Sequence, residues 1–169
     1  MILLEIIYIL IGIFVVTFLE GFLSSLIGLR ITFIILLLLY KKIDWRILFL
    51  IMFFLFLISD ITSHYILGTN LLIALVSLVF FAILCIFVTT ETGVFSWLVK
   101  FLTFFLYYIL LATVPTLFIS QKFSNITVNT LTHSLLISLI SVLLTTLLQR
   151  MIGKIRDESG ERSKIKLSR

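Results

Sequence analysis

This sequence contains very few residues that could carry out chemistry. The chain of 169 residues has one cysteine, two histidines, one proline and only 12% charged residues. A lone cysteine, Cys85, cannot form a disulfide within the chain, and two histidines are too few to complete a metal site. The sequence also lacks a glycine-rich phosphate loop, paired cysteines and a nucleophile elbow. We therefore predict a non-enzymatic protein with no catalytic residues, no cofactor and no metal.

The shortage of charge is matched by an excess of apolar residues. Hydrophobic residues make up 62% of the chain, and the mean hydropathy is +1.31. Such a composition excludes a soluble domain and indicates an integral membrane protein. The long unbroken apolar runs exclude a β-barrel, whose strands would alternate in polarity. The predicted fold is an all-α, polytopic helical bundle in the lipid bilayer.

Apolar runs of suitable length predict six membrane spans, at about residues 2–19, 22–40, 45–61, 67–88, 95–118 and 131–152. The second is ambiguous because Ser24, Ser25, Gly28 and Arg30 interrupt it. Either one span covers 22–40 with Arg30 buried, or an irregular segment leads into a short helix over 31–40. Residues 1–152 then form one transmembrane domain, and residues 153–169 form a basic cytoplasmic tail.

The distribution of cations predicts the orientation in the membrane. Six spans place most Lys and Arg residues, including Lys41, Lys42, Lys100 and those of the tail, on one side, and only Arg30 and Lys122 on the other. Short cytoplasmic loops are enriched in Lys and Arg, so both termini should be cytoplasmic. This bias also accounts for the basic pI, and we expect no nucleic-acid partner.

One acidic residue stands out within the apolar sequence. A helix starting at Trp45 would raise Asp60 by roughly 22 Å, and a preceding helix running the opposite way would place Arg30 about 17 Å above Lys41. A charge in a membrane is normally paired or faces a polar cavity. We predict an ion pair between Asp60 and Arg30, with His64, Thr62 or Ser63 satisfying the remaining lone pairs. A proton or cation site at Asp60 is the alternative.

Small hydroxyl residues recur along one face of the last predicted helix. Ser134, Ser138, Ser141 and Thr145 follow one another at spacings of four, three and four residues. Small residues let another helix approach closely and hydrogen-bond across the contact. This hydroxyl stripe could either dock a separate protein or pack within the chain's own bundle.

The stretch from Ile31 to Leu84 has a recognisable order. A Leu-rich helix and a basic turn precede a helix ending in Asp60, and Leu67 and Gly68 then open the next apolar helix, with Asn70 in its first turn. This order resembles the rod shape-determining protein MreD family, in which a helix ends in an acid and a Leu-Gly pair follows within about ten residues. The glycine and the proline that the family usually has near these elements are absent here. Asp60 matches the acid of the family and Leu67 with Gly68 matches its pair. We predict structural or interface roles for Asp60, His64, Gly68 and Asn70.

The resemblance implies a non-enzymatic membrane scaffold of the bacterial cell-elongation machinery, in the cytoplasmic membrane. Its expected partners are an MreC-like bitopic protein, MreB filaments indirectly, RodA and a penicillin-binding transpeptidase. Substrate-binding subunits of energy-coupling-factor vitamin transporters are the alternative, because they are also six-helix proteins of this size. They would show small residues spaced by four in the first helix, where this chain has Gly12 without a matching partner.

Overall fold

The computed structural model describes the backbone of residues 2–40, 43–63, 65–88, 93–120 and 127–167, and the side chains of 12, 14–40, 43–63, 65–88, 93–116 and 127–154. Within these residues the chain forms six helices and no strand. They are α1 (Ile2–Ile27), α2 (Ile31–Leu39), α3 (Trp45–Thr62), α4 (Thr69–Phe87), α5 (Gly93–Ser120) and α6 (Val128–Leu167). The predicted all-α bundle is confirmed.

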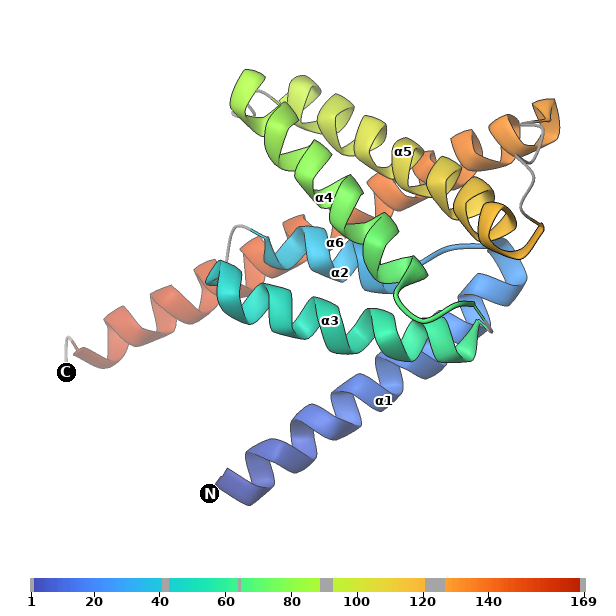
Figure 1. The fold of residues 1–169 in the computed structure, drawn as a ribbon. Coiled ribbons are helices and arrows are strands. Elements are labelled where there is room, and N and C mark those ends of the chain that lie inside the picture. The colour runs from blue at the N-terminus through green and yellow to red at the C-terminus, as the bar shows by residue number, and fades with distance from the viewer. Residues whose placement is uncertain (1, 41–42, 64, 89–92, 121–126, 168–169) are drawn as a thin grey trace.

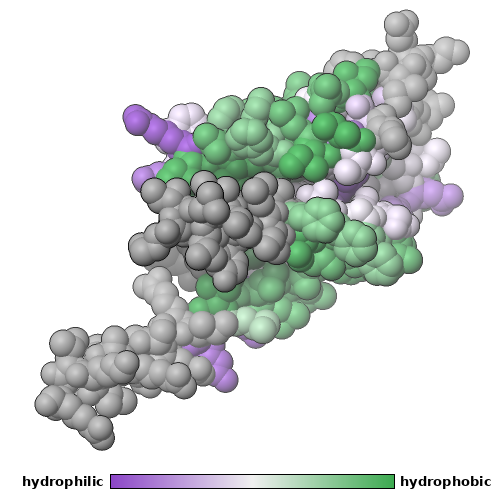
Figure 2. All heavy atoms as spheres, turned by 90° about the horizontal axis from the view of Figure 1, so that it is seen from below, coloured by the Kyte–Doolittle hydropathy of each residue, from purple (hydrophilic) through white to green (hydrophobic). Residues whose placement is uncertain are grey.

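Four of these helices, α3 to α6, are long and apolar enough to cross a membrane. Their exposed side chains include many large hydrophobic residues, as expected for surfaces that face hydrocarbon. On the face seen in Figure 2, hydrophobic residues cover most of the coloured surface, and strongly hydrophilic ones project at its edges. The start of α1 and the end of α6 lie on the same side of the bundle (Figure 1).

The first two helices differ from the expected spans. Helix α1 does not stop at Leu19 but continues through Glu20 and Gly21 to Ile27. The chain then breaks at Gly28, whose φ of 77° lies in the left-handed region that ends helices. Helix α2 has only nine residues, a length of about 14 Å. Of the two alternatives for this segment, the short helix is observed, but the irregular part is confined to residues 28–30 because residues 22–27 belong to α1.

Helix α2 occupies the centre of the bundle, between α1, α3 and α6 (Figure 1). Six of its nine residues are buried, which explains why the sequence of α2 is apolar on every side. Its Phe33 stacks on Tyr107 of α5 with ring centroids 4.0 Å apart, and it meets Phe104 edge-on at 5.5 Å. This packing fixes the N-terminus of α2, and with it Arg30, inside the protein.

Helix α6 is much longer than its predicted span. It runs without a break to Leu167, through the segment where the polar tail was expected to begin. Its first part packs against α5, and α5 packs in turn against α4.

Candidate functional site

A buried ion pair links the end of α1 to the start of α2. Arg30 Nη1 lies 3.4 Å from Glu20 Oε1, and both side chains are almost fully buried. The other carboxylate oxygen, Glu20 Oε2, accepts the backbone N–H of Thr32 at 3.0 Å. The first N–H groups of a helix have no partner within the helix, so Glu20 both neutralises Arg30 and caps α2.

A second acid caps α4 in a similar way. Asp60 is fully buried, and its two carboxylate oxygens accept the backbone N–H groups of Gly68 at 2.7 Å and Asn70 at 2.8 Å. Gly68 has a φ of 92°, which a residue with a Cβ rarely adopts. The carboxylate therefore satisfies the N-terminus of α4, where negative charge is also favoured by the helix dipole.

The predicted ion pair between Asp60 and Arg30 is wrong. Arg30 pairs with Glu20 instead, and Ser63 also accepts a hydrogen bond from Arg30 rather than serving Asp60. The predicted pair rested on the similar depths of Asp60 and Arg30 in the membrane. It also assumed that the first helix ends before Glu20. Because α1 continues past Glu20, this acid reaches the interior and is the closer partner.

Ser59 connects the two capped junctions. Its hydroxyl donates to Glu20 Oε1 at 3.2 Å and accepts hydrogen bonds from Arg30 Nη1 at 3.2 Å and Asn70 Nδ2 at 3.3 Å. Glu20, Arg30, Ser59, Asp60 and Asn70 thus form one buried polar cluster across α1, α3 and the start of α4. His64, which was predicted to assist Asp60, lies outside the described residues.

Glu20 and Ser59 were not predicted as site residues from the sequence. The available signal was position, because each acid precedes the N–H groups that it caps by eight to twelve residues, and a glycine of positive φ lies at the break in the chain. That pattern predicts a helix, a tight break and a second helix whose first turn is capped from outside.

The hydroxyl stripe of α6 is buried within the bundle. Ser134, Ser138, Ser141 and Thr145 are all buried, and Ser141 Oγ is hydrogen-bonded to the Tyr108 hydroxyl of α5 at 2.9 Å. Ser138 and Thr145 donate to carbonyl oxygens of their own helix. Of the two alternatives, internal packing is therefore the role of this stripe, and these side chains are not available to a separate protein.

A polar cavity of about 250 Å³ opens beside the cluster, between the α1–α2 break, the α3–α4 link, α5 and α6. Its walls include Arg30, Tyr65, Tyr108, His133 and Ser134. The Tyr108 hydroxyl on this wall also accepts the backbone N–H of Arg30 at 3.2 Å. The cavity therefore lies at the end of the bundle where α3 and α5 finish and α4 and α6 begin.

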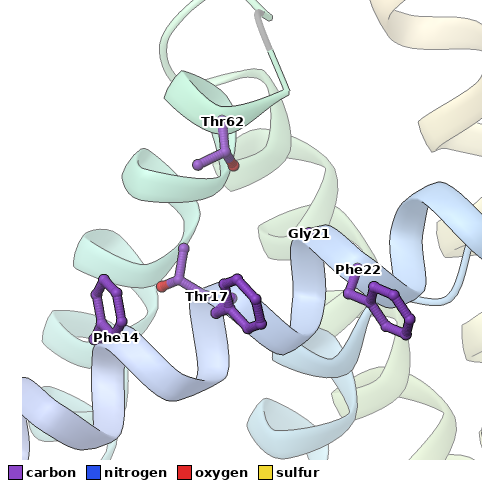
Figure 3. Close-up of a pocket in the computed structure, with 6 residues that line it drawn as sticks. Phe14, Thr17, Gly21, Phe22 and Thr62 are labelled. Carbon is purple, nitrogen blue, oxygen red and sulfur yellow. The ribbon is translucent and has the colours of Figure 1, made fainter.

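An apolar groove of about 410 Å³ lies on the outside of the bundle, between α1 and α3. Figure 3 shows Phe14, Thr17, Gly21 and Phe22 along α1, with Thr62 of α3 facing them. Phe14 and Phe22 are exposed. The principal contacts of α1 are with its neighbours α2 and α3. The face of α1 that lines the groove is therefore open to the membrane.

Among the side chains that the structure describes, no three His, Cys, Asp or Glu residues lie close enough together to hold a metal ion. No protein-family model, curated protein or solved structure matches this chain.

Proposed function

We propose that this chain is a non-enzymatic scaffold of the MreD type in the bacterial cell-elongation machinery. It would lie in the cytoplasmic membrane with both termini inside. It would hold an MreC-like bitopic protein and, through it, couple RodA, a penicillin-binding transpeptidase and MreB to peptidoglycan synthesis.

The contact between Asp60 and Gly68 supports this proposal. These residues belong to the two sequence elements that carry the resemblance, and they are joined by a hydrogen bond of 2.7 Å from the Gly68 N–H to Asp60 Oδ2. Their spacing therefore reflects a single structural unit, an acid that caps the following helix. A chance likeness in two unconnected elements would not require this contact.

The groove between α1 and α3 offers a place for the partner. Its apolar lining and its position on the membrane-facing side suit the single transmembrane helix of a bitopic protein. We therefore place the MreC-like helix in this groove, and not on the buried stripe of α6.

Co-purification of the chain with the MreC-like protein of the same organism tests this assignment. Gly21→Leu fills the groove, and a Cβ at Gly21 meets no atom within 4 Å, so the chain itself tolerates the change. Gly12→Leu is the matched control, because it lies on the same helix, is equally unhindered and does not line the groove. We expect Gly21→Leu to lower partner recovery severalfold and Gly12→Leu to leave it unchanged. Failure of the unaltered chain to retain an MreC-like protein would refute the proposal.

Two observations outside the protein bear on the same proposal. Genes for MreB and MreC beside this one, and loss of rod shape on depletion, would support it.

Labelling of single cysteines in a Cys85→Ala background tests the orientation, since reaction of a cysteine at position 164 from outside intact cells would contradict internal termini.

The second candidate is the substrate-binding subunit of an energy-coupling-factor vitamin transporter. The polar cavity of about 250 Å³ is the observation that favours it. Retention of an ATPase pair in place of an MreC-like protein would decide for this candidate.

A further inference from the structure

We propose that the polar cavity beside the cluster is a water-filled vestibule that reaches about halfway into the membrane. This inference goes beyond the scaffold function and does not depend on it. Three features carry it: the depth of the cavity, the backbone carbonyl groups at its wall that lack a helical donor, and the polarity of its lining.

The depth of the cavity follows from the residues that line it. On α6 the lining extends from Thr130 to Ile137, and the apolar part of this helix begins at Val128. At 1.5 Å per residue, Ile137 lies roughly 14 Å from that end, whereas the hydrocarbon core is about 30 Å thick. On α5, the lining reaches back to Tyr108, roughly 12 Å from the end of the apolar part at Thr116. The two helices therefore agree on a cavity that ends near the middle of the membrane.

The break between α1 and α2 brings carbonyl groups without helical donors to this cavity. The acids of the cluster satisfy N–H groups, but the last carbonyl groups of α1 are acceptors and need a donor. The Ser24 carbonyl accepts the Gly28 N–H at 3.0 Å, and the carbonyls that follow it in α1 have no helical N–H to accept. Ser24 and Gly28 both line the cavity. Non-helical backbone is tolerated at membrane depth only where protein buries it or water reaches it.

Helix α5 adds another carbonyl of this kind. Pro115 lies inside α5 and has no N–H, so the Leu111 carbonyl, four residues earlier, loses its helical donor. Leu111 lines the cavity. The Thr113 hydroxyl of the same turn donates to the carbonyls of Ile109 and Leu110 instead. Ordered water is one of the partners that satisfy carbonyl groups freed by proline in membrane helices.

The lining is polar enough to keep water in the cavity. Tyr65, Thr130 and His133 contribute polar side chains to the wall, and His133 is exposed. A volume of about 250 Å³ holds several water molecules, since each takes about 30 Å³ in the liquid. Apolar cavities stay dry, whereas cavities with several polar partners hold ordered water. Water, and not a hydrocarbon chain, is therefore the occupant that the wall favours.

Cysteine labelling of the full chain in lipid nanodiscs tests the vestibule. Ala112→Cys and Ile137→Cys, each in a Cys85→Ala background, place a thiol on the cavity wall. Leu136→Cys is the matched control, because Leu136 lies next to Ile137 on α6 and does not line the cavity. Both faces of a nanodisc are open to the reagent, so the result does not depend on the orientation of the chain.

The expected result runs against simple exposure. Leu136 is 61% exposed and Ile137 only 4%, but the surroundings of Leu136 are hydrocarbon. The charged reagent MTSET stays in water and reacts with the thiolate, which desolvation disfavours. We expect both wall cysteines to react at least about tenfold faster than Leu136→Cys, since one pKa unit of desolvation already removes about nine-tenths of the thiolate.

Filling the cavity locates the path of the reagent. Ala112→Leu added to Ile137→Cys should slow the labelling severalfold, whereas Ala82→Leu, on α4 and not part of the lining, should leave it unchanged. If Ala112→Leu does not fold, the comparison of the wall cysteines with Leu136→Cys still decides. Wall cysteines that react only after denaturation in SDS, equal or faster reaction of Leu136→Cys, or unchanged labelling in folded Ala112→Leu would each overturn the proposal.

Discussion

The α1–α2 and α3–α4 junctions solve the same problem with different charges. In each, a helix ends, a glycine with positive φ turns the chain, and an acid of the first helix accepts an N–H group of the second. Glu20 gives one oxygen to Thr32 and the other to Arg30. Asp60 gives both oxygens to backbone N–H groups. A buried carboxylate can therefore be held by a cation, a hydroxyl and one N–H group, as Glu20 is, or bonded by two N–H groups at a helix N-terminus, as Asp60 is.

This comparison explains why the interior contains acids at all. A helix that begins within hydrocarbon has no water to satisfy its first N–H groups, and each one left unpaired is costly. An acid from the preceding helix satisfies them and also ties the two helices together. The second function matters most for α2, which is too short to cross the membrane alone.

The largest effect is expected from Glu20→Ala. This change removes the cap of α2 and leaves Arg30 buried without its counter-charge. The free energy of unfolding should fall by about 4 kcal/mol. Unfolding in mixtures of mild detergent and SDS measures it. The control is the double variant Glu20→Gln with Arg30→Gln, which removes both charges and should be more stable than Glu20→Ala. Equal loss in both would show that the charge of Arg30 is not what Glu20 compensates.

Asp60→Ala should destabilise the chain somewhat less. It leaves the N–H groups of Gly68 and Asn70 unpaired, at a cost of about 3 kcal/mol for the two together, but strands no cation in direct contact. Asp60→Asn keeps one acceptor oxygen and should lose about half as much. Adding Arg30→Gln to Asp60→Asn should bring no recovery, because Arg30 is not the partner of Asp60. Recovery in that double variant would restore the rejected pair.

The two glycines should respond differently to alanine. Both adopt positive φ, so both variants carry a strain of about 1 kcal/mol. A Cβ at Gly28 would also lie 3.1 Å from Ile137 Cδ1 and 3.3 Å from His133 Cε1, whereas one at Gly68 meets open space. We expect Gly28→Ala to lower the unfolding midpoint more than Gly68→Ala. The opposite order would mean that the contact of Gly28 with α6 relaxes freely.

Ser59→Ala should have the smallest effect, about 1 kcal/mol, because Arg30 and Asp60 keep their main partners. This variant tests whether Ser59 couples the two junctions energetically, since Ser59 bonds to Glu20 at one and to Asn70 at the other. A double-mutant cycle between Glu20→Gln and Asn70→Ala should show an interaction energy that disappears in the Ser59→Ala background. Persistence of the interaction without Ser59 would require another route between the junctions.

Composition and periodicity alone determined that this chain is an all-α membrane bundle, because hydrocarbon permits few other structures for so apolar a sequence. The spans now seen as α3 and α4 were also predicted to within two residues at each end, since polar residues mark where they stop. The location of Asp60 near the end of α3 followed from the same pattern.

Only the tertiary structure decided the partners of the buried charges. Sequence spacing gives the depth of a residue along its own helix, but not the direction in which a neighbouring helix presents its side chains. Glu20 appeared to end a helix because an isolated acid is unfavourable in hydrocarbon. It lies inside α1 because Arg30, Thr32 and Ser59 meet it there. For the same reason the stripe of α6 showed that something packs against it, and only the fold identified that partner as α5.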